Sequence, residues 1–449
     1  MIIPSNPFWL RYTPTFIRRR LEGRTNLHSI IHNTGWLLGD KALRLGFGLL
    51  VGAWVARYLG PSQFGELSYV LAFVAFFQVI SQLGLDSIAI RDMARDREAS
   101  PAILGTVFRL RIITGILCWI AAIGSMALFR PGDLNALILT AVVSGSLVFQ
   151  AADTVDLWFQ SQTQSKRTVL AKTLTYVLNS LFKIGLILLK APLLYFAIAG
   201  LIEFALAALA LSFSYRMFPA PFKWQWELEW AKRLLKESWP YMLSGLAIII
   251  YIRIDQIMLR EMIGLHELGV FSAALPLSTT WYFIPMIISQ SIGPTIAKLK
   301  NTDIEVYNKS INRLFSVMWL VTLPLSILIA ILSGPIVIFF YGKEYLASAG
   351  VLAIHVFANI PVALGVVHSI WIVNERKNTL SLTKAVIGAI SNIILNLLLI
   401  PKHGAIGAAY ATVLSTALSG VISNSILDPI IFKRQMLSLF SYKWPIKYK

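Results

Sequence analysis

The sequence predicts an all-α integral membrane protein of about twelve transmembrane helices, arranged as two pseudo-symmetric six-helix bundles. Three observations support this prediction: the composition, the alternation of basic clusters with apolar runs, and a repeated segment. Of the 449 residues, 56% are hydrophobic and 14% are charged, whereas soluble domains carry about 25% charged residues. The apolar runs are long and do not alternate with polar residues, which excludes a transmembrane β-barrel.

Each apolar run is long enough to cross a bilayer. A helix rises about 1.5 Å per residue, so about 20 apolar residues span a hydrocarbon core of ~30 Å. In one run, Ser333, Gly334 and Pro335 interrupt the pattern, and we expect a half-helix from there to Tyr341 and Gly342. The predicted spans are 35–58, 66–84, 103–129, 134–155, 168–189, 192–214, 238–262, 270–293, 312–340, 346–372, 378–400 and 405–431.

The basic residues orient these spans. We assign 26 of the 40 Lys and Arg to the side that holds the N-terminus, six to the opposite side and eight to the spans. The positive-inside rule therefore places both termini in the cytoplasm, because an even number of spans returns the chain to its starting side. The net charge of +18 is spread over many short clusters, which argues against a nucleic-acid partner. Residues 1–33 are basic and lack an apolar stretch before a cleavage site, so we expect no signal peptide.

A repeated segment relates the two halves of the chain. LGPSQFGELS at 59–68 recurs as IGLHELGVFS at 263–272, an offset of 204 residues, and a weaker match relates 165–168 to 375–378. Because each half holds six spans, both copies insert in the same orientation, which predicts a pseudo-two-fold axis along the membrane normal and a cavity between the bundles. Chance similarity between two glycine-containing turns is the alternative.

The longest internal connection lies between the halves, at 219–238. Trp224, Trp226 and Trp230 mix there with charged residues, which predicts a helix in the inner membrane interface, with a plain polar linker as the alternative. The predicted organisation is a basic cytoplasmic arm at 1–33, a six-helix bundle at 34–217, the interfacial linker at 218–237, a second six-helix bundle at 238–432 and a basic cytoplasmic tail at 433–449.

Charged residues inside the spans are the candidate functional residues. A charge at the bilayer centre costs about 2.5–3.5 kcal/mol, so such residues face protein or a watery cavity. The basic ones all lie on odd-numbered spans, which begin at the cytoplasm, and this predicts a cavity that attracts an anion from that side. We rank Arg253 first for binding the anion, followed by Lys41, Arg44, Arg109 and Lys183; the others are Arg111, Lys172 and Lys384. The carboxylates that are candidates for ion coupling are Asp255, Glu203 and Asp40.

Structural roles are the alternative for several of these residues. Asp40 and Arg44 are four apart on one helix face and can pair, and Arg253 can belong to a structural ion pair. Lys172 and Lys384 lie about one turn inside their spans and can reach the headgroups with their side chains. Arg109 and Arg111 are two apart and point to different sides of one helix.

Motifs for catalysis and metal binding are absent from the sequence. None of the six histidines is spaced from another His or Cys as metal ligands are, and no phosphate-binding Walker motif occurs. The chain has one cysteine, Cys118, and thus no disulfide framework. We therefore expect a transporter with no catalytic residues, metal or cofactor.

The chain resembles the polysaccharide transporter branch of the MATE-like MOP flippase superfamily over residues 30–432. The segments that carry the resemblance are ARYLGPSQFG at 56–65, GLD at 84–86, AIR at 89–91, RIDQIML at 253–259 and YGKEY at 341–345. The resemblance implies a MATE-like fold with a V-shaped central cavity and alternating access. It also implies a flippase for undecaprenyl-pyrophosphate-linked oligosaccharide repeat units in O-antigen, lipopolysaccharide, capsule or exopolysaccharide biosynthesis.

Such a flippase would lie in the bacterial inner membrane, contact membrane lipids and work beside the polymerase and chain-length proteins of its pathway. A pyrophosphate is an anion, so the predicted cationic cavity agrees with this substrate. Two alternatives remain at this point: a cation-coupled multidrug or metabolite exporter of the same fold, and a membrane-embedded polysaccharide polymerase or glycosyltransferase. The eight basic span residues weigh against the first, and the lack of a large extracytoplasmic loop weighs against the second.

Overall fold

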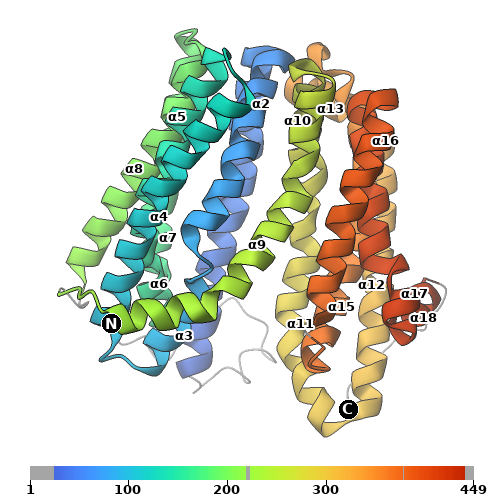
Figure 1. The fold of residues 1–449 in the computed structure, drawn as a ribbon. Coiled ribbons are helices and arrows are strands. Elements are labelled where there is room, and N and C mark those ends of the chain that lie inside the picture. Colours follow the sequence, from blue (N-terminus) through green and yellow to red (C-terminus); the bar gives the residue numbers. More distant parts are fainter. Residues whose placement is uncertain (1–24, 219–222, 378, 440–449) are drawn as a thin grey trace, which may run out of the picture. The chain divides into compact units, whose positions relative to one another are not determined.

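The computed structural model describes residues 25–218, 223–377 and 379–439, without the side chains of 25–38 and 40–42. In these ranges the regular structure is helical, and no strand occurs among them (Figure 1). Packing divides the chain into two units. Unit 1 comprises Met1–Val51 and Phe77–Met242, and unit 2 comprises Gly52–Phe76 and Leu243–Lys449.

Helix α2 (Thr25–Gln82) consists of two arms joined at Gly60, the one residue in it with non-helical dihedrals. Gly60 has φ 71°, a left-handed conformation that glycine adopts without steric cost, and Pro61 follows it without a backbone N–H to donate. The repeat partner of Gly60, at an offset of 204, is Gly264, and it also has a positive φ, 134°. The spans predicted at 35–58 and 66–84 are these two arms.

The two copies of the repeat contact each other within unit 2. A Cβ on Gly65 would lie 2.0 Å from the Leu265 carbonyl oxygen, and a Cβ on Gly269 would lie 1.8 Å from the Pro61 carbonyl oxygen. Gly65 pairs with Gly269, and Pro61 with Leu265, at the offset of 204, so each contact is the repeat image of the other. Small residues allow such close helix crossings in membranes. This reciprocal contact favours an internal repeat over chance similarity.

Unit 1 is built on long apolar helices packed side by side. Helix α4 packs on α5, α5 on α8 and α7 on α8 (Figure 1). The predicted span 134–155 is interrupted, because α5 gives way to a 3-10 turn at Gln150. The further elements of this unit are α3 (Asp86–Arg95), α4 (Ser100–Phe129), α5 (Leu134–Phe149), η2 (Gln150–Asp153), α6 (Thr154–Ser161), α7 (Lys166–Leu188) and α8 (Leu193–Met217).

Helix α9 (Leu228–Met262) begins ten residues before the predicted span at 238–262. Residues 228–237, predicted as part of a separate interfacial helix, form its first turns. They pack on unit 1, with Ala231 and Leu234 buried and Glu237 accepting a hydrogen bond from Arg91 at 2.7 Å. The backbone N–H of Gln225 donates to the backbone carbonyl of Pro101 at 3.0 Å. These contacts anchor the connection before α9 enters unit 2.

Unit 2 contains more interrupted helices than unit 1. Helix α12 ends at Ile331 and α13 begins at Ser333, which confirms the predicted break and half-helix. The elements are α10 (Leu265–Thr279), η3 (Thr280–Tyr282), α11 (Phe283–Thr302), α12 (Ile304–Ile331), α13 (Ser333–Tyr341), η4 (Lys343–Tyr345), α14 (Ser348–His355), η5 (Val356–Ala358), α15 (Asn359–Asn374), α16 (Thr379–Ala417), the π-turn η6 (Leu418–Ile422), α17 (Asn424–Leu427) and α18 (Pro429–Leu437).

Ten helices in the described ranges are long and apolar enough to cross a membrane. Two of them, Leu43–Arg95 and Thr379–Leu427, are 53 and 49 residues long. Each contains a non-helical glycine, Gly60 or Gly404, and therefore accounts for two of the predicted spans. The all-α multi-pass membrane fold is thus confirmed.

Candidate functional site

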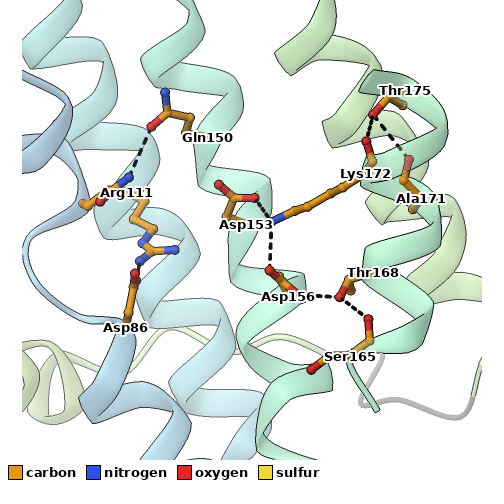
Figure 2. Close-up of polar contacts among 11 residues, drawn as sticks. Asp86, Arg111, Gln150, Asp153, Asp156, Ser165, Thr168, Ala171, Lys172 and Thr175 are labelled. Carbon is orange, nitrogen blue, oxygen red and sulfur yellow. Dashed lines mark hydrogen bonds and ion pairs between the residues drawn. The ribbon is translucent and has the colours of Figure 1, made fainter. Parts of the chain in front are cut away.

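In unit 1, Lys172 lies between two carboxylates. Its Nζ is 2.7 Å from Asp153 Oδ1 and 2.8 Å from Asp156 Oδ2, and Thr168 donates to the other oxygen of Asp156 (Figure 2). Asp153 ends η2, Asp156 lies in the first turn of α6, and Lys172 and Thr168 lie on α7. The alternative in which Lys172 reaches the headgroups is therefore wrong, because its ammonium turns inward onto two carboxylates.

Arg111 on α4 is also neutralised within unit 1. Its Nη2 contacts Asp86 Oδ1 at the start of α3 (Figure 2), where a carboxylate is favoured by the helix dipole. Arg111 is buried, whereas Arg109, two residues earlier, is exposed. This difference confirms that the two arginines point to different sides. Arg109 stays a predicted anion-binding residue.

Two predicted site residues of unit 1, Lys183 and Glu203, form one ion pair. Lys183 Nζ lies 3.7 Å from Glu203 Oε2, and Asn179 donates to the same oxygen. Arg44 stacks over the Tyr176 ring, 5.0 Å from its centroid, and its carbonyl accepts from the Tyr176 hydroxyl at 3.2 Å. The side chains of Lys41 and Asp40 lie outside the described residues, so the proposed pairing of Asp40 with Arg44 stays a prediction.

Arg253, on α9 in unit 2, has a different environment. Its Nη1 donates to the neutral amide oxygen of Gln256 at 3.2 Å. Its Nε is buried and has no hydrogen-bond partner. Within the described part of the chain, no carboxylate contacts this guanidinium. The alternative in which Arg253 forms a structural ion pair therefore has no support in these residues. Arg253 is thus a partly buried cation with a donor left unused.

Asp255, two residues further along α9, is buried and surrounded by neutral groups. Asn396 Nδ2 donates to Asp255 Oδ1 at 2.5 Å, and Thr412 Oγ1 donates to Oδ2 at 2.5 Å. Asn392 lies one turn before Asn396, and its Oδ1 accepts from Asn396 Nδ2 at 3.1 Å. One carboxylate, two amides and a hydroxyl provide oxygen ligands of the kind that hard cations prefer. The Asp255 cluster can hold a proton or a small cation.

The sequence interpretation missed the partners of Asp255. Asn392 and Asn396 are four residues apart in an apolar span, and this spacing places both on one helix face. Polar residues that share one face of a transmembrane helix turn toward protein. That signal pointed to a polar contact for this helix, but it did not identify Asp255, 141 residues away, as the partner.

Comparison with known families agrees with this fold. Residues 30–300, more than half of the chain, match the model of the family described as polysaccharide biosynthesis protein. Residues 281–444 match the model of the lipid II flippase MurJ. The chain is 26% identical over 402 residues to a protein of Haloferax volcanii named as a probable flippase, AglR, and the match covers 86% of this chain and 80% of that protein.

Solved structures share the fold. A multidrug resistance MATE family transporter of the MOP superfamily, in an inward-facing conformation, matches with a TM-score of 0.74 and 15% identity over 88% of this chain and 96% of that one. The lipid II flippase MurJ, in an inward closed conformation, matches with a TM-score of 0.68 and 18% identity over 91% of each chain. At these identities the likeness concerns the fold alone.

Proposed function

The chain belongs to the polysaccharide biosynthesis protein family, and on this premise we propose that it is a flippase for a lipid-linked oligosaccharide. The expected substrate is an oligosaccharide repeat unit on undecaprenyl pyrophosphate, moved from the cytoplasmic to the outer leaflet for O-antigen, capsule or exopolysaccharide synthesis. The chain itself carries out transport and no covalent step. The proposed location is the bacterial inner membrane, with both termini in the cytoplasm. The proposed partners are the polymerase and chain-length proteins of the pathway.

The observation that carries this proposal is the guanidinium of Arg253. A partly buried cation with a free Nε donor, and with no carboxylate contact among the described residues, is costly in a membrane unless an anion binds there. A pyrophosphate supplies that anion, and the planar guanidinium suits its oxygens. Lys41, Arg44, Arg109 and Lys183 are the remaining proposed contacts. Of these, Lys183 is already paired with Glu203 and is the weakest candidate.

The proposal extends to ion coupling at Asp255. The Asp255 cluster has no Lys or Arg contact in the described part of the chain, so its carboxylate needs a proton or a monovalent cation when its oxygens face only neutral groups. Glu203 is a weaker candidate because Lys183 already neutralises it. Uptake of an ion at Asp255 would supply the driving force for transport.

The Asp255 cluster also favours a second candidate function, a cation-coupled exporter of drugs or metabolites. Such an exporter needs a coupling carboxylate and has no need of an unpaired Arg253. The two candidates therefore differ in the effect of neutralising Arg253. Neutralising Arg253 should reduce transport of a pyrophosphate-linked substrate about tenfold or more, and it should leave export of a cationic drug unchanged or increase it.

The experiment is complementation of a deletion strain that has no other flippase. We expect lipid-linked repeat units to accumulate on the cytoplasmic face of the deletion strain and to disappear when the wild-type chain is restored. Arg253→Gln should reduce translocation about tenfold or more, since a hydrogen bond to a charged group contributes ~1.5–3 kcal/mol.

Arg253→Lys, which keeps the charge, is the matched variant and should retain part of the activity. Membrane abundance of each variant is measured beside the glycan. Surface glycan at the wild-type level in the deletion strain, or in Arg253→Gln, would contradict the proposed flippase function.

A further inference from the structure

Unit 2 contains a second buried polar group that the proposed transport cycle does not use. Lys384 on α16 and His368 on α15 are both buried, and Lys384 Nζ lies 2.7 Å from His368 Nδ1. Lys384 Nζ also donates to the Gly420 carbonyl oxygen at 3.3 Å. The sequence interpretation in which Lys384 reaches the headgroups is therefore wrong, because its amine points into the bundle.

No carboxylate contacts this pair in the described part of the chain. The charged and titratable groups on the elements packed around it have other partners. Lys300 on α11 and Tyr307 on α12 both contact Glu375, which follows α15. His355 on α14 bonds to Ser278. Lys377 contacts Asp428, and Arg434 on α18 donates to Asn308. Tyr282 lies on η3, and Asp255 bonds to Asn396 further along α16. Asp428 Oδ2 lies 3.6 Å from Lys377 Nζ.

The hydrogen-bond geometry allows one shared proton. If Lys384 is an ammonium, His368 Nδ1 must accept, and the Nε2–H then has no acceptor. If His368 donates from Nδ1, Lys384 must be a neutral amine that accepts. In both states His368 Nε2 is buried without a partner. Two cations at 2.7 Å would repel each other with no counterion in contact. The pair thus binds one proton fewer than two isolated side chains would bind.

The proton state of the pair is linked to a deformed segment of backbone. Gly420 belongs to the π-turn η6, and its carbonyl accepts from Lys384, from Asn424 Nδ2 at 3.0 Å and from Gln435 Nε2 at 3.2 Å. A carbonyl oxygen has two lone pairs, so these three donors compete. A charged Lys384 competes more strongly than a neutral one. Single π-turns are frequent at functional sites.

We propose that Lys384, His368 and the Gly420 carbonyl form a proton-binding site that holds one proton. When Lys384 carries the proton, it draws the Gly420 carbonyl away from Asn424 and Gln435. When Lys384 is neutral, the amides of Asn424 on α17 and Gln435 on α18 hold the Gly420 carbonyl, and the π-turn stays packed on α18. This site is separate from the Asp255 cluster and goes beyond the proposed function, because it gives the last membrane helix a proton-dependent position in the absence of any substrate.

The test uses the purified full-length protein without substrate. As the pH falls from about 8 to about 5.5, the unfolded chain protonates both side chains whereas the folded pair holds only one proton, so the wild-type melting temperature should fall. His368→Gln and Lys384→Met should each reduce this fall by about 3 °C. His355→Gln is the matched control, since His355 is a buried histidine of the same unit that bonds to the Ser278 hydroxyl. In the His355→Gln variant, adding Lys384→Met should still reduce the fall in melting temperature by about 3 °C.

A second measurement follows the π-turn directly. A nitroxide at the exposed position Ser425→Cys, in a Cys118→Ser background, should change mobility between about pH 7 and about pH 10, where Lys384 loses its proton, and this change should be absent with Lys384→Met. If Lys384→Met does not fold, the melting temperature of His368→Gln, which keeps the lysine, decides the result. Identical pH profiles for the wild type and His368→Gln would overturn the proposal. The proposed flippase function is tested separately, because no substrate is present here.

Discussion

In unit 1, the ammonium of Lys172 lies between the carboxylates of Asp153 and Asp156, whereas in unit 2 the guanidinium of Arg253 donates to the neutral amide of Gln256. The first arrangement compensates its own charge. The second leaves a charge and a donor available to a ligand. Of these two cations, Lys172 has counterions and Arg253 has none among its described contacts.

The acidic residues show the same contrast. Glu203 in unit 1 lies 3.7 Å from Lys183, while Asp255 in unit 2 accepts from Asn396 and Thr412. Removing one member of an ion pair is destabilising, because it leaves the other charge uncompensated. Neutral partners leave a carboxylate able to exchange an ion. The contrast is therefore between an acid that already has a counterion, Glu203, and an acid that has none among the described residues, Asp255.

The largest expected effect is on the stability of unit 1. Asp153→Asn together with Asp156→Asn leaves Lys172 without a counterion and should lower the free energy of unfolding by about 3 kcal/mol, the low end for breaking a buried pair, since Lys172 keeps partial exposure. Thermal unfolding in detergent measures it. Adding Lys172→Met should restore most of the lost stability. An unchanged melting temperature in the double Asp→Asn variant would contradict the claim that these two carboxylates compensate the charge of Lys172.

In unit 2, neutralising an acid should affect transport more than stability. Asp255→Asn keeps the shape of the cluster and should change the free energy of unfolding by less than about 1 kcal/mol, because the partners are neutral. Translocation should fall by about tenfold or more, within the usual range of coupling energies. Asp255→Glu keeps the charge and is the control. A collapse of stability in Asp255→Asn with normal transport per folded molecule would contradict an ion-coupling role.

The smallest effect concerns Lys183 and Glu203. Both are partly exposed, so a double-mutant cycle with Lys183→Gln and Glu203→Gln should give a coupling energy of only about 0.5 kcal/mol. If the pair is structural, the double variant should transport normally. If Lys183→Gln loses translocation and the double variant with Glu203→Gln does not regain it, Lys183 would belong to the anion site. Unit 1 would then contribute a substrate contact as well.

The membrane helices and the break at Ser333 were predictable from sequence because they depend on local properties, whereas the interruption at Gln150 was not predicted. Apolar length sets the spans. Ser333, Gly334 and Pro335 marked the break that separates α12 from α13. The repeat was also visible, and the structure adds its physical reason: Gly65 and Gly269 lie so close to the opposing backbone that neither can carry a Cβ.

The roles of the charged residues were not predictable in the same way. Sequence identified Lys172, Lys183, Arg253 and Lys384 as span cations and ranked Arg253 first for the anion site, but it did not identify the partner of any of them. The partners of the lysines come from other elements, at separations of 16 residues for Lys172 with Asp156 and 36 for Lys384 with Gly420, whereas Arg253 bonds to Gln256 on its own helix. Nothing local distinguishes a lysine that meets a carboxylate from one that meets a histidine.

By itself, then, the sequence determined an all-α membrane protein with an internal repeat, since hydropathy and chain geometry act over a few turns of helix. Only the tertiary structure decided which charges are compensated. The partner of a side chain depends on which helices pack together and on the face that each presents, and these follow from contacts across the whole unit. That distinction separates Lys172 and Arg111 from Arg253, and it is the basis of the proposed anion site.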